Sequence, residues 1–221
     1  MQGRYNVLFL CTGNSARSIM AEAIMNYKGR PNFTAYSAGS HPSGAVRPEA
    51  IAQLENAHLP TDGLRSKSWE EFSKPDAPQL DFVFTVCDNA AKEVCPVWPG
   101  QPQTAHWGVP DPAAVRGTTE EIKRAYRDAF MTLERRISLF LCLPLASIDK
   151  LAIKKEIDKI GHQCEESDWC RKRLGQSSCS NRAEEAHLCR HVGCVGIYKE
   201  FSWRSLLWRR MWRAYTAYTP T

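Results

Sequence analysis

The chain has 221 residues, with 29 lysines and arginines against 24 aspartates and glutamates, and a formal net charge of +5. Hydrophobic residues make up 43% of it and charged residues 24%, which excludes a wholly disordered chain. No apolar run reaches the roughly 18 residues of a membrane-spanning helix, and the apolar run at 7–10 is too short for a signal-peptide core. We therefore expect a cytoplasmic protein whose nine cysteines are thiols, catalytic groups or metal ligands rather than disulfides.

Strand-like and helix-like segments alternate along residues 1–160. Short apolar or β-branched runs predict strands at 5–10, 33–38, 81–86 and 103–107. Helical spacing and capping signals predict helices at 19–27, 48–54, 118–143 and from about 147 to Gly161, which can stop the last one. The alternation predicts an α/β fold with a central parallel sheet and helices on both faces, in a domain spanning residues 1–160.

The clearest chemical signal lies between the first strand and the first helix. This segment reads Cys11-Thr12-Gly13-Asn14-Ser15-Ala16-Arg17-Ser18. Small residues allow backbone N–H groups to converge into an anion nest, and the following helix adds its positive end. Arg17 can hold two oxygens of a tetrahedral oxyanion, and the positive field should lower the pKa of Cys11 so that it is a thiolate near neutrality, steadied by Ser18. The segment therefore predicts a nucleophile fused to an oxyanion site.

A general acid for the leaving oxygen is the next requirement of such a site. Asp111 is the best candidate, because it lies between Pro110 and Pro112, whose rings restrain the backbone of the loop. An ordinary Asp-Pro turn is the alternative interpretation of the same residues.

Two further cysteines follow the third predicted strand. Cys87 comes directly after it, and Cys95 precedes Pro96. The carboxyl ends of parallel strands share one edge of a sheet, so Cys87 can lie beside Cys11. The polar segment 88–94 can be mobile enough to bring Cys95 to Cys87, and three such thiols permit relayed disulfide exchange. Two small buried hydrophobic residues are an equally good interpretation.

The motifs together resemble the low-molecular-weight protein tyrosine phosphatases, and still more the related thiol-dependent arsenate reductases. Besides the loop at 11–18, the resemblance rests on Ser37-Ala38-Gly39, Thr85-Val86-Cys87, Cys95-Pro96 and His106-Trp107-Gly108-Val109-Pro110-Asp111-Pro112. It covers about residues 5–160 and implies a three-layer phosphatase-like fold with a parallel sheet of about four strands. The pair of Cys87 and Cys95 favours the reductases over the phosphatases.

The resemblance also implies a mechanism, in which Cys11 attacks the arsenic of arsenate while Arg17 and the loop N–H groups hold the oxygens. Asp111 protonates the departing oxygen, and disulfides then pass from Cys11–Cys87 to Cys87–Cys95. Thioredoxin, or glutaredoxin with glutathione, is the expected reductant; the spacing of Cys87 and Cys95, one residue longer than in some thioredoxin-linked relatives, leaves that choice open. Ala16 stands where many relatives carry a second loop cysteine.

Two alternative functions stay open. A phosphatase on the same fold using Cys11, Arg17 and Asp111 is the nearest, and a non-catalytic oxyanion or As(III) binder, acting through the loop or the thiols of the tail, is the second. No metal or organic cofactor is required. Some relatives bind potassium at positions that Asn14, Glu22 and Ser37 match loosely, although ordinary structural roles explain these residues as well. We expect a monomer without nucleic-acid partners.

Residues 161–221 differ from the rest of the chain. They hold five of the nine cysteines, four of the seven tryptophans and +4 of the net charge. The thiols and imidazoles at 187–194 match no standard zinc finger, and the Trp-Arg pairs at 203–213 lack the periodicity of a membrane-binding helix. We expect an atypical, partly disordered C-terminal extension. Cys142, on the long predicted helix, is expected in the core.

Overall fold

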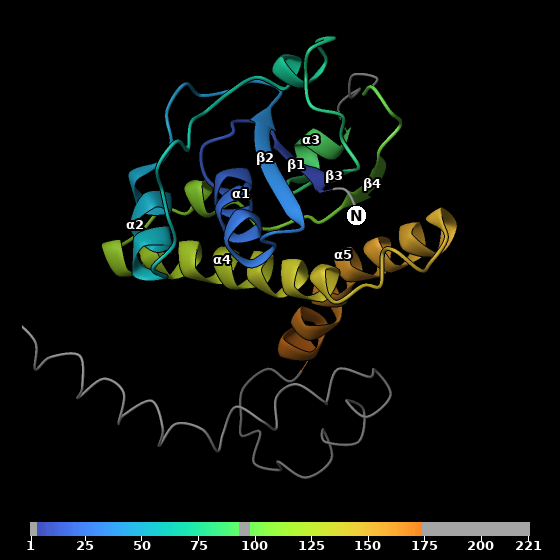
Figure 1. Cartoon of the computed structure of the whole chain (residues 1–221). Coiled ribbons are helices and arrows are strands. Elements are labelled where there is room, and N and C mark those ends of the chain that lie inside the picture. Colours follow the sequence, from blue (N-terminus) through green and yellow to red (C-terminus); the bar gives the residue numbers. More distant parts are fainter. Residues whose placement is uncertain (1–3, 93–97, 174–221) are drawn as a thin grey trace, which may run out of the picture. The chain divides into compact units, whose positions relative to one another are not determined.

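The computed structural model describes residues 4–92 and 98–173, shown in colour in Figure 1. The predicted strands and long helices are all present, with boundaries shifted by a few residues, except that the last helix ends at Arg173. In chain order the elements are β1 (Tyr5–Cys11), α1 (Arg17–Lys28), β2 (Phe33–Gly39), α2 (Pro48–Asn56), the 3-10 helix η1 (Trp69–Phe72), β3 (Phe82–Thr85), α3 (Asp88–Lys92), β4 (Gln103–His106), the 3-10 helix η2 (Pro112–Ala114), α4 (Thr119–Leu141) and α5 (Lys150–Arg173).

The four strands form one parallel sheet in the order β2-β1-β3-β4, which confirms the predicted α/β architecture. Cys11 pairs with Gly39 of β2, and Leu10 pairs with Thr85 of β3. The carboxyl ends of the two central strands therefore lie next to each other. This register brings the residues that follow β1 and β3 to one edge of the sheet.

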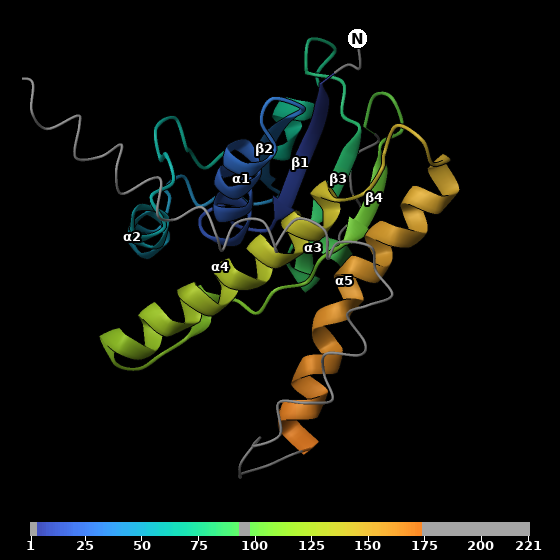
Figure 2. The same ribbon diagram turned by 60° about the horizontal axis from the view of Figure 1, so that its bottom comes forward.

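Side chains of β1 alternate between two apolar layers, as a strand buried on both faces requires. Val7 and Phe9 belong to the larger layer, which α1, α4 and α5 cover on one face of the sheet (Figures 1 and 2). There the rings of Phe84 and Trp107 stack with their centroids 3.9 Å apart. Leu8 and Leu10 belong to the smaller layer on the opposite face, which Phe72, Leu80 and Trp98 complete. The result is the three-layer fold that the resemblance implied.

The start of α4 is fixed by the capping box that the sequence predicts. The Thr118 hydroxyl accepts from the Glu121 N–H at 3.3 Å, and the Glu121 carboxylate accepts from the Thr118 N–H at 2.7 Å. These bonds satisfy amide groups that have no partner within the helix.

Helix α5 does not stop at Gly161, and this prediction was wrong. The helix runs to Arg173, across the boundary expected at residue 160. Gly161 is needed for close packing instead, because a Cβ there would collide with the carbonyl oxygen of His106 at the end of β4. The Trp107 indole donates to the Ile157 carbonyl at 2.9 Å in the same contact. The separate C-terminal extension expected at 161–221 remains a prediction.

The polar segment after Cys87 begins as the short helix α3. One smaller expectation was wrong. Cys142 lies at the C-cap of α4 and is exposed, not buried in the core. Cys95 and the tail cluster at 187–194 lie outside the described residues. Within the described residues, no helix is both long enough and apolar enough to cross a membrane.

Candidate active site

The loop between β1 and α1 is held from outside by the segment that follows β2. Four of its carbonyl groups accept backbone N–H groups from that segment at 2.9–3.3 Å: those of Cys11, Thr12, Gly13 and Ser15, from Ser40, His41, Ser43 and Arg47. A planar trans peptide points its N–H opposite to its carbonyl, so the following N–H groups face inward. Asn14 has a φ of 42°, which turns the loop back on itself. Such a nest of N–H groups is suited to binding an anion.

The first N–H groups of α1 complete this nest. In the part of the chain that the structure describes, the N–H groups of Ser15, Ala16 and Arg17 donate to no protein acceptor. They lie at the positive end of a twelve-residue helix. A tetrahedral oxyanion in the loop would therefore meet several donors and a favourable dipole at once.

Cys11 lies at the base of the loop and is 3% exposed. Its sulfur accepts from the Asn14 N–H at 3.1 Å and lies 2.9 Å from the Ser18 hydroxyl. Burial raises the pKa of the Cys11 thiol above its ordinary value, and this outweighs the lowering by Ser18, Asn14 and Arg17. The expectation of a lowered pKa was therefore wrong, because desolvation of the charged form exceeds the positive field of the loop.

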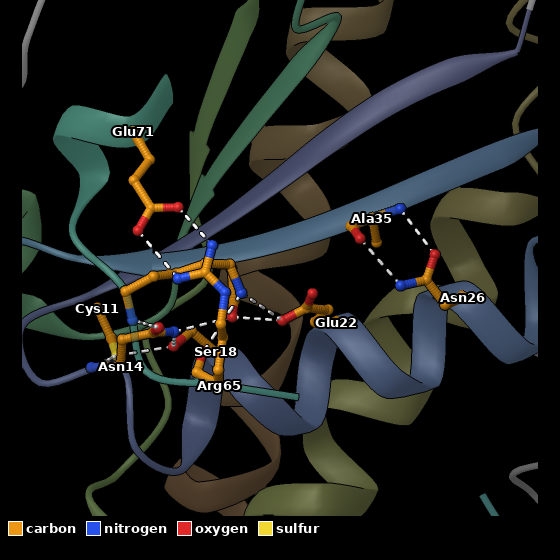
Figure 3. Close-up of polar contacts among 10 residues, drawn as sticks. Cys11, Asn14, Ser18, Glu22, Asn26, Ala35, Arg65 and Glu71 are labelled. Carbon is orange, nitrogen blue, oxygen red and sulfur yellow. Dashed lines mark hydrogen bonds and ion pairs between the residues drawn. The ribbon is translucent and has the colours of Figure 1, made fainter. Parts of the chain in front are cut away.

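The side chain of Asn14 sets the direction of the hydrogen bonds around Cys11, as Figure 3 shows for Asn14, Ser18 and Cys11. Its amide nitrogen donates to Ser18 at 2.9 Å and to Ser37 at 2.8 Å, which uses both of its hydrogens. Because Ser18 Oγ accepts from Asn14, its own hydrogen is left to donate to the Cys11 sulfur. A hydrogen bond in this direction stabilises the thiolate over the thiol.

Arg17 and Asp111, predicted separately, meet across the loop. Arg17 Nη2 lies 3.0 Å from Asp111 Oδ2, and Arg17 Nη1 donates to the Val109 carbonyl at 3.1 Å. The other Asp111 oxygen accepts from the Ala113 N–H at 3.0 Å, at the start of η2. The Asp111 side chain remains 42% exposed. The Asp111 carboxyl, held by Arg17 and by the Ala113 N–H beside the loop, is well placed to exchange protons with an oxyanion bound there.

Cys87 is buried on the same edge of the sheet, as its position after β3 predicts. Its sulfur accepts from the Ala90 N–H at 3.4 Å and lies 3.5 Å from the hydroxyl of Thr12. Cys87 is close enough to Cys11 that its charge contributes to raising the pKa of the Cys11 thiol. The structure thus brings two of the three predicted relay thiols to one loop.

The potassium candidates also converge, but their oxygens are already occupied. Ser37 Oγ accepts from Asn14 and donates to Glu22 Oε2 at 2.5 Å. The same Glu22 oxygen lies 3.3 Å from the ammonium of Lys67, whose backbone N–H donates to Asn14 Oδ1 at 2.7 Å. These residues do not fit a potassium ion, because the Lys67 ammonium already occupies the place of a cation beside the Glu22 carboxylate. Within the described part of the chain, no group of three or more His, Cys, Asp or Glu side chains could hold a metal ion.

Sequence reasoning missed two buried cations beside the site, Lys67 and Arg136. Lys67 lies just before η1 in the chain and resembles any surface lysine in the sequence. Arg136 is 2% exposed and lies on the buried face of α4 with Leu133 and Phe140, so its helical spacing could have marked it. No local pattern marks Lys67, since its burial depends on Glu22, which is distant in the chain.

Replacing Ser18 with alanine should slow alkylation of Cys11 by iodoacetamide about tenfold at neutral pH, since hydrogen bonds to charged groups contribute roughly 1.5–3 kcal/mol. The variant loses a donor to the thiolate, so the pKa of Cys11 rises further and less thiolate is present. Mass spectrometry of the Cys11 peptide across a pH series measures the effect. Ser138→Ala, which removes only an exposed contact with Lys28, is the matched control. Identical profiles for both variants would contradict the assigned hydrogen-bond direction.

A parallel sheet whose first strand ends in a buried cysteine, followed by an oxyanion loop and an arginine, defines a cysteine-dependent phosphatase type of protein. Residues 6–156 match the family of low molecular weight phosphotyrosine protein phosphatases, and the chain belongs to this family. The match runs from Asn6 in β1 to Glu156 in the first third of α5.

Several relatives carry names more specific than that of the family. The arsenate reductase of Halalkalibacterium halodurans is 33% identical over 134 residues, which cover 61% of this chain and 93% of the relative. The arsenate reductase of Bacillus subtilis is 35% identical over 115 residues, covering 52% and 79%.

Solved structures agree with this fold. An arsenate reductase in its oxidized state superposes with a TM-score of 0.50 at 26% identity, covering 62% of this chain and 95% of that one. The low molecular weight protein tyrosine phosphatase from T. tengcongensis has the same TM-score at 24% identity, covering 61% and 95%. The second likeness concerns the fold alone.

Proposed function

We propose that the chain reduces arsenate to arsenite with thiols as the source of electrons. The observation that carries the proposal is the second buried thiol, Cys87, at the edge of the oxyanion loop, 3.5 Å from the Thr12 hydroxyl. Hydrolysis of a phosphate ester needs one nucleophilic thiol and has no use for a second. The arsenate reductases among the relatives support the same activity.

In the first proposed step, the Cys11 thiolate attacks arsenic and a sulfur–arsenic bond forms. The N–H groups of the loop and the Arg17 guanidinium hold the oxygens. Asp111 lies 3.0 Å from Arg17 and can protonate the departing oxygen, which leaves as water. Burial of Cys11 favours the thiol over the thiolate, so the Ser18 and Asn14 donors are needed to supply the nucleophile.

In the second step, the Cys87 thiolate attacks the Cys11 sulfur. The sulfur–arsenic bond breaks and its electron pair stays on arsenic, which is reduced from As(V) to As(III) and leaves as arsenite. A Cys11–Cys87 disulfide forms, so the two electrons come from the two thiols. The chemistry requires no metal or organic cofactor.

Cys95 is proposed to attack Cys87 next, releasing the Cys11 thiol and moving the disulfide to Cys87–Cys95. An external dithiol protein such as thioredoxin, or glutaredoxin with glutathione, then reduces this disulfide by exchange. Cys95 lies outside the described residues, so its part rests on the sequence. A cytoplasmic location is proposed with it, because such a cycle needs a compartment that keeps thiols reduced.

A phosphatase is the second candidate, and the contact between Arg17 and Asp111 favours it. That pair, with Cys11, contains the oxyanion holder, acid and nucleophile that phosphate-ester hydrolysis needs. Phosphate resembles arsenate in shape and charge but does not accept two electrons from a thiol. Binding of oxyanion or As(III) without catalysis is the third outcome to be tested.

The Cys87→Ser variant separates these functions. With arsenate, thioredoxin, thioredoxin reductase and NADPH, the unmodified protein should oxidise NADPH steadily, and Cys87→Ser should abolish this oxidation. Weak hydrolysis of an aryl phosphate should survive in the variant, because Cys11, Arg17 and Asp111 remain. Cys142→Ser, at an exposed thiol, is the control and should retain both activities.

Other results would decide for the alternatives. Brisk aryl-phosphate hydrolysis by both proteins, with no arsenate turnover, would identify a phosphatase. Oxyanion binding without turnover, with glutaredoxin and glutathione also tested, would identify a binding protein.

A further inference from the structure

A buried ion pair lies behind the oxyanion loop and is not used in the proposed chemistry. The side chains of Glu22 on α1 and Lys67 are 11% and 6% exposed, with Glu22 Oε2 3.3 Å from Lys67 Nζ. Burial raises the pKa of the Glu22 carboxyl, and the Lys67 ammonium is the largest opposing influence. Lys67 therefore favours the ionised carboxylate in a place where desolvation disfavours it.

The Glu22 carboxylate is the last acceptor in a chain of hydrogen bonds that reaches the nucleophile. Ser37 donates its hydroxyl hydrogen to Glu22 at 2.5 Å, so its oxygen is an acceptor for Asn14 at 2.8 Å. Asn14 also donates to Ser18 at 2.9 Å, and Ser18 lies 2.9 Å from the Cys11 sulfur. An ionised Glu22 can only accept, so Ser37 donates to it and the Ser37 oxygen is left as an acceptor for the Asn14 amide.

Lys67 holds this chain at a second point. Its backbone N–H donates to Asn14 Oδ1 at 2.7 Å, which fixes the orientation of the Asn14 amide. Its ammonium also donates to the Arg65 carbonyl at 3.3 Å, and Figure 3 shows Arg65 and Glu71 facing each other beside the same site. The segment around Lys67 is thus anchored to the loop through both backbone and side chain.

We propose that Lys67 is a positioning residue, the internal cation that keeps Glu22 an acceptor and so directs the Ser37–Asn14–Ser18 chain toward the Cys11 sulfur. It stands in place of an external monovalent cation, because its ammonium already supplies the positive charge at the Glu22 carboxylate. The inference rests on the proposed function only in that Cys11 is taken as the nucleophile.

The test measures the rate of iodoacetamide alkylation of Cys11, read from the Cys11 peptide, so arsenate turnover is not required. Lys67→Met keeps most of the aliphatic stem and removes the charge, and it should slow alkylation about tenfold. Lys67→Arg should restore most of the rate. When potassium chloride replaces choline chloride at the same ionic strength, the alkylation rate of the unmodified protein should not change. The alkylation rate of Lys67→Met should rise severalfold. Lys28→Met, at an ion pair with Glu134 on the surface, should behave like the unmodified protein.

Ser37→Ala breaks the chain while leaving both charges in place, and it keeps the proposal testable if Lys67→Met does not fold. It should slow alkylation as Lys67→Met does, and the double variant should be no slower than either single one, because both act through the same chain. An unchanged rate in Ser37→Ala, strictly additive effects, or acceleration of the unmodified protein by potassium would overturn the proposal. If the alkylation rates are as expected but the protein does not reduce arsenate, only the proposed function is contradicted.

Discussion

Replacing Cys11 with serine is expected to abolish arsenate reduction and aryl-phosphate hydrolysis together, each by at least about 10³-fold. Serine fits the space and can keep the contacts with Asn14 and Ser18, at 3.1 and 2.9 Å from the present sulfur. A hydroxyl in this buried place is a far weaker nucleophile than a thiolate, and its oxygen cannot form the disulfide that releases As(III). Steady-state rates with both substrates measure the loss.

The control for this variant is Cys142→Ser, since Cys142 is an exposed thiol remote in sequence from the loop. Circular dichroism and thermal melting should show both variants folded. Aryl-phosphate hydrolysis that survives in Cys11→Ser would contradict the assignment of Cys11 as the nucleophile. If Cys142→Ser lost activity as well, the loss in Cys11→Ser would not be specific to the proposed nucleophile.

Replacing Arg136 with methionine is expected to destabilise the fold by about 3 kcal/mol, because buried carbonyl groups lose their donor. Its guanidinium donates to the carbonyls of Trp107 and Gly108 at 2.8 Å each and of Gly161 at 2.9 Å. These bonds join α4, the segment after β4 and α5 at a single buried point. For a domain of this size the loss corresponds to a fall in melting temperature of roughly 6–12 °C.

Arg135→Met is the matched control, because Arg135 is the exposed neighbour of Arg136 on the same helix. It should leave the melting temperature nearly unchanged. Calorimetry or circular dichroism on both variants gives the comparison. Equal melting temperatures would mean that water or rearranged donors satisfy the three carbonyls, and that Arg136 does not hold α5 to the sheet.

Much of the fold could be predicted because the information is local. Phe82–Thr85 is a short apolar and β-branched strand, and Thr118 and Glu121 form their capping box within one helical turn. The loop at 11–18 carries its chemistry in consecutive residues, so the nucleophile, the arginine and the nest could be recognised together. The parallel order of strands then placed Cys87 at the same edge.

Gly161 shows where the local rules fail. A glycine near the end of a helical pattern usually indicates a C-terminus, but here it allows α5 to pass close to the carbonyl oxygen of His106. The reason lies more than 50 residues away in the chain, in the position of β4. Arg136 is similar. An arginine on a helix is expected in solvent, but Arg136 is buried and donates to the carbonyls of three other residues.

The electrostatics of the site also depended on the tertiary structure. The order of strands and helices, the loop at 11–18 and the candidate nucleophile, cation and acid could be predicted from the chain alone, because each is encoded in a short stretch of residues. Only the folded chain decided that burial raises the pKa of Cys11, that Arg17 meets Asp111 and that Lys67 lies against Glu22. Desolvation and charge pairing depend on which distant segments surround a group, and no local pattern of residues records that.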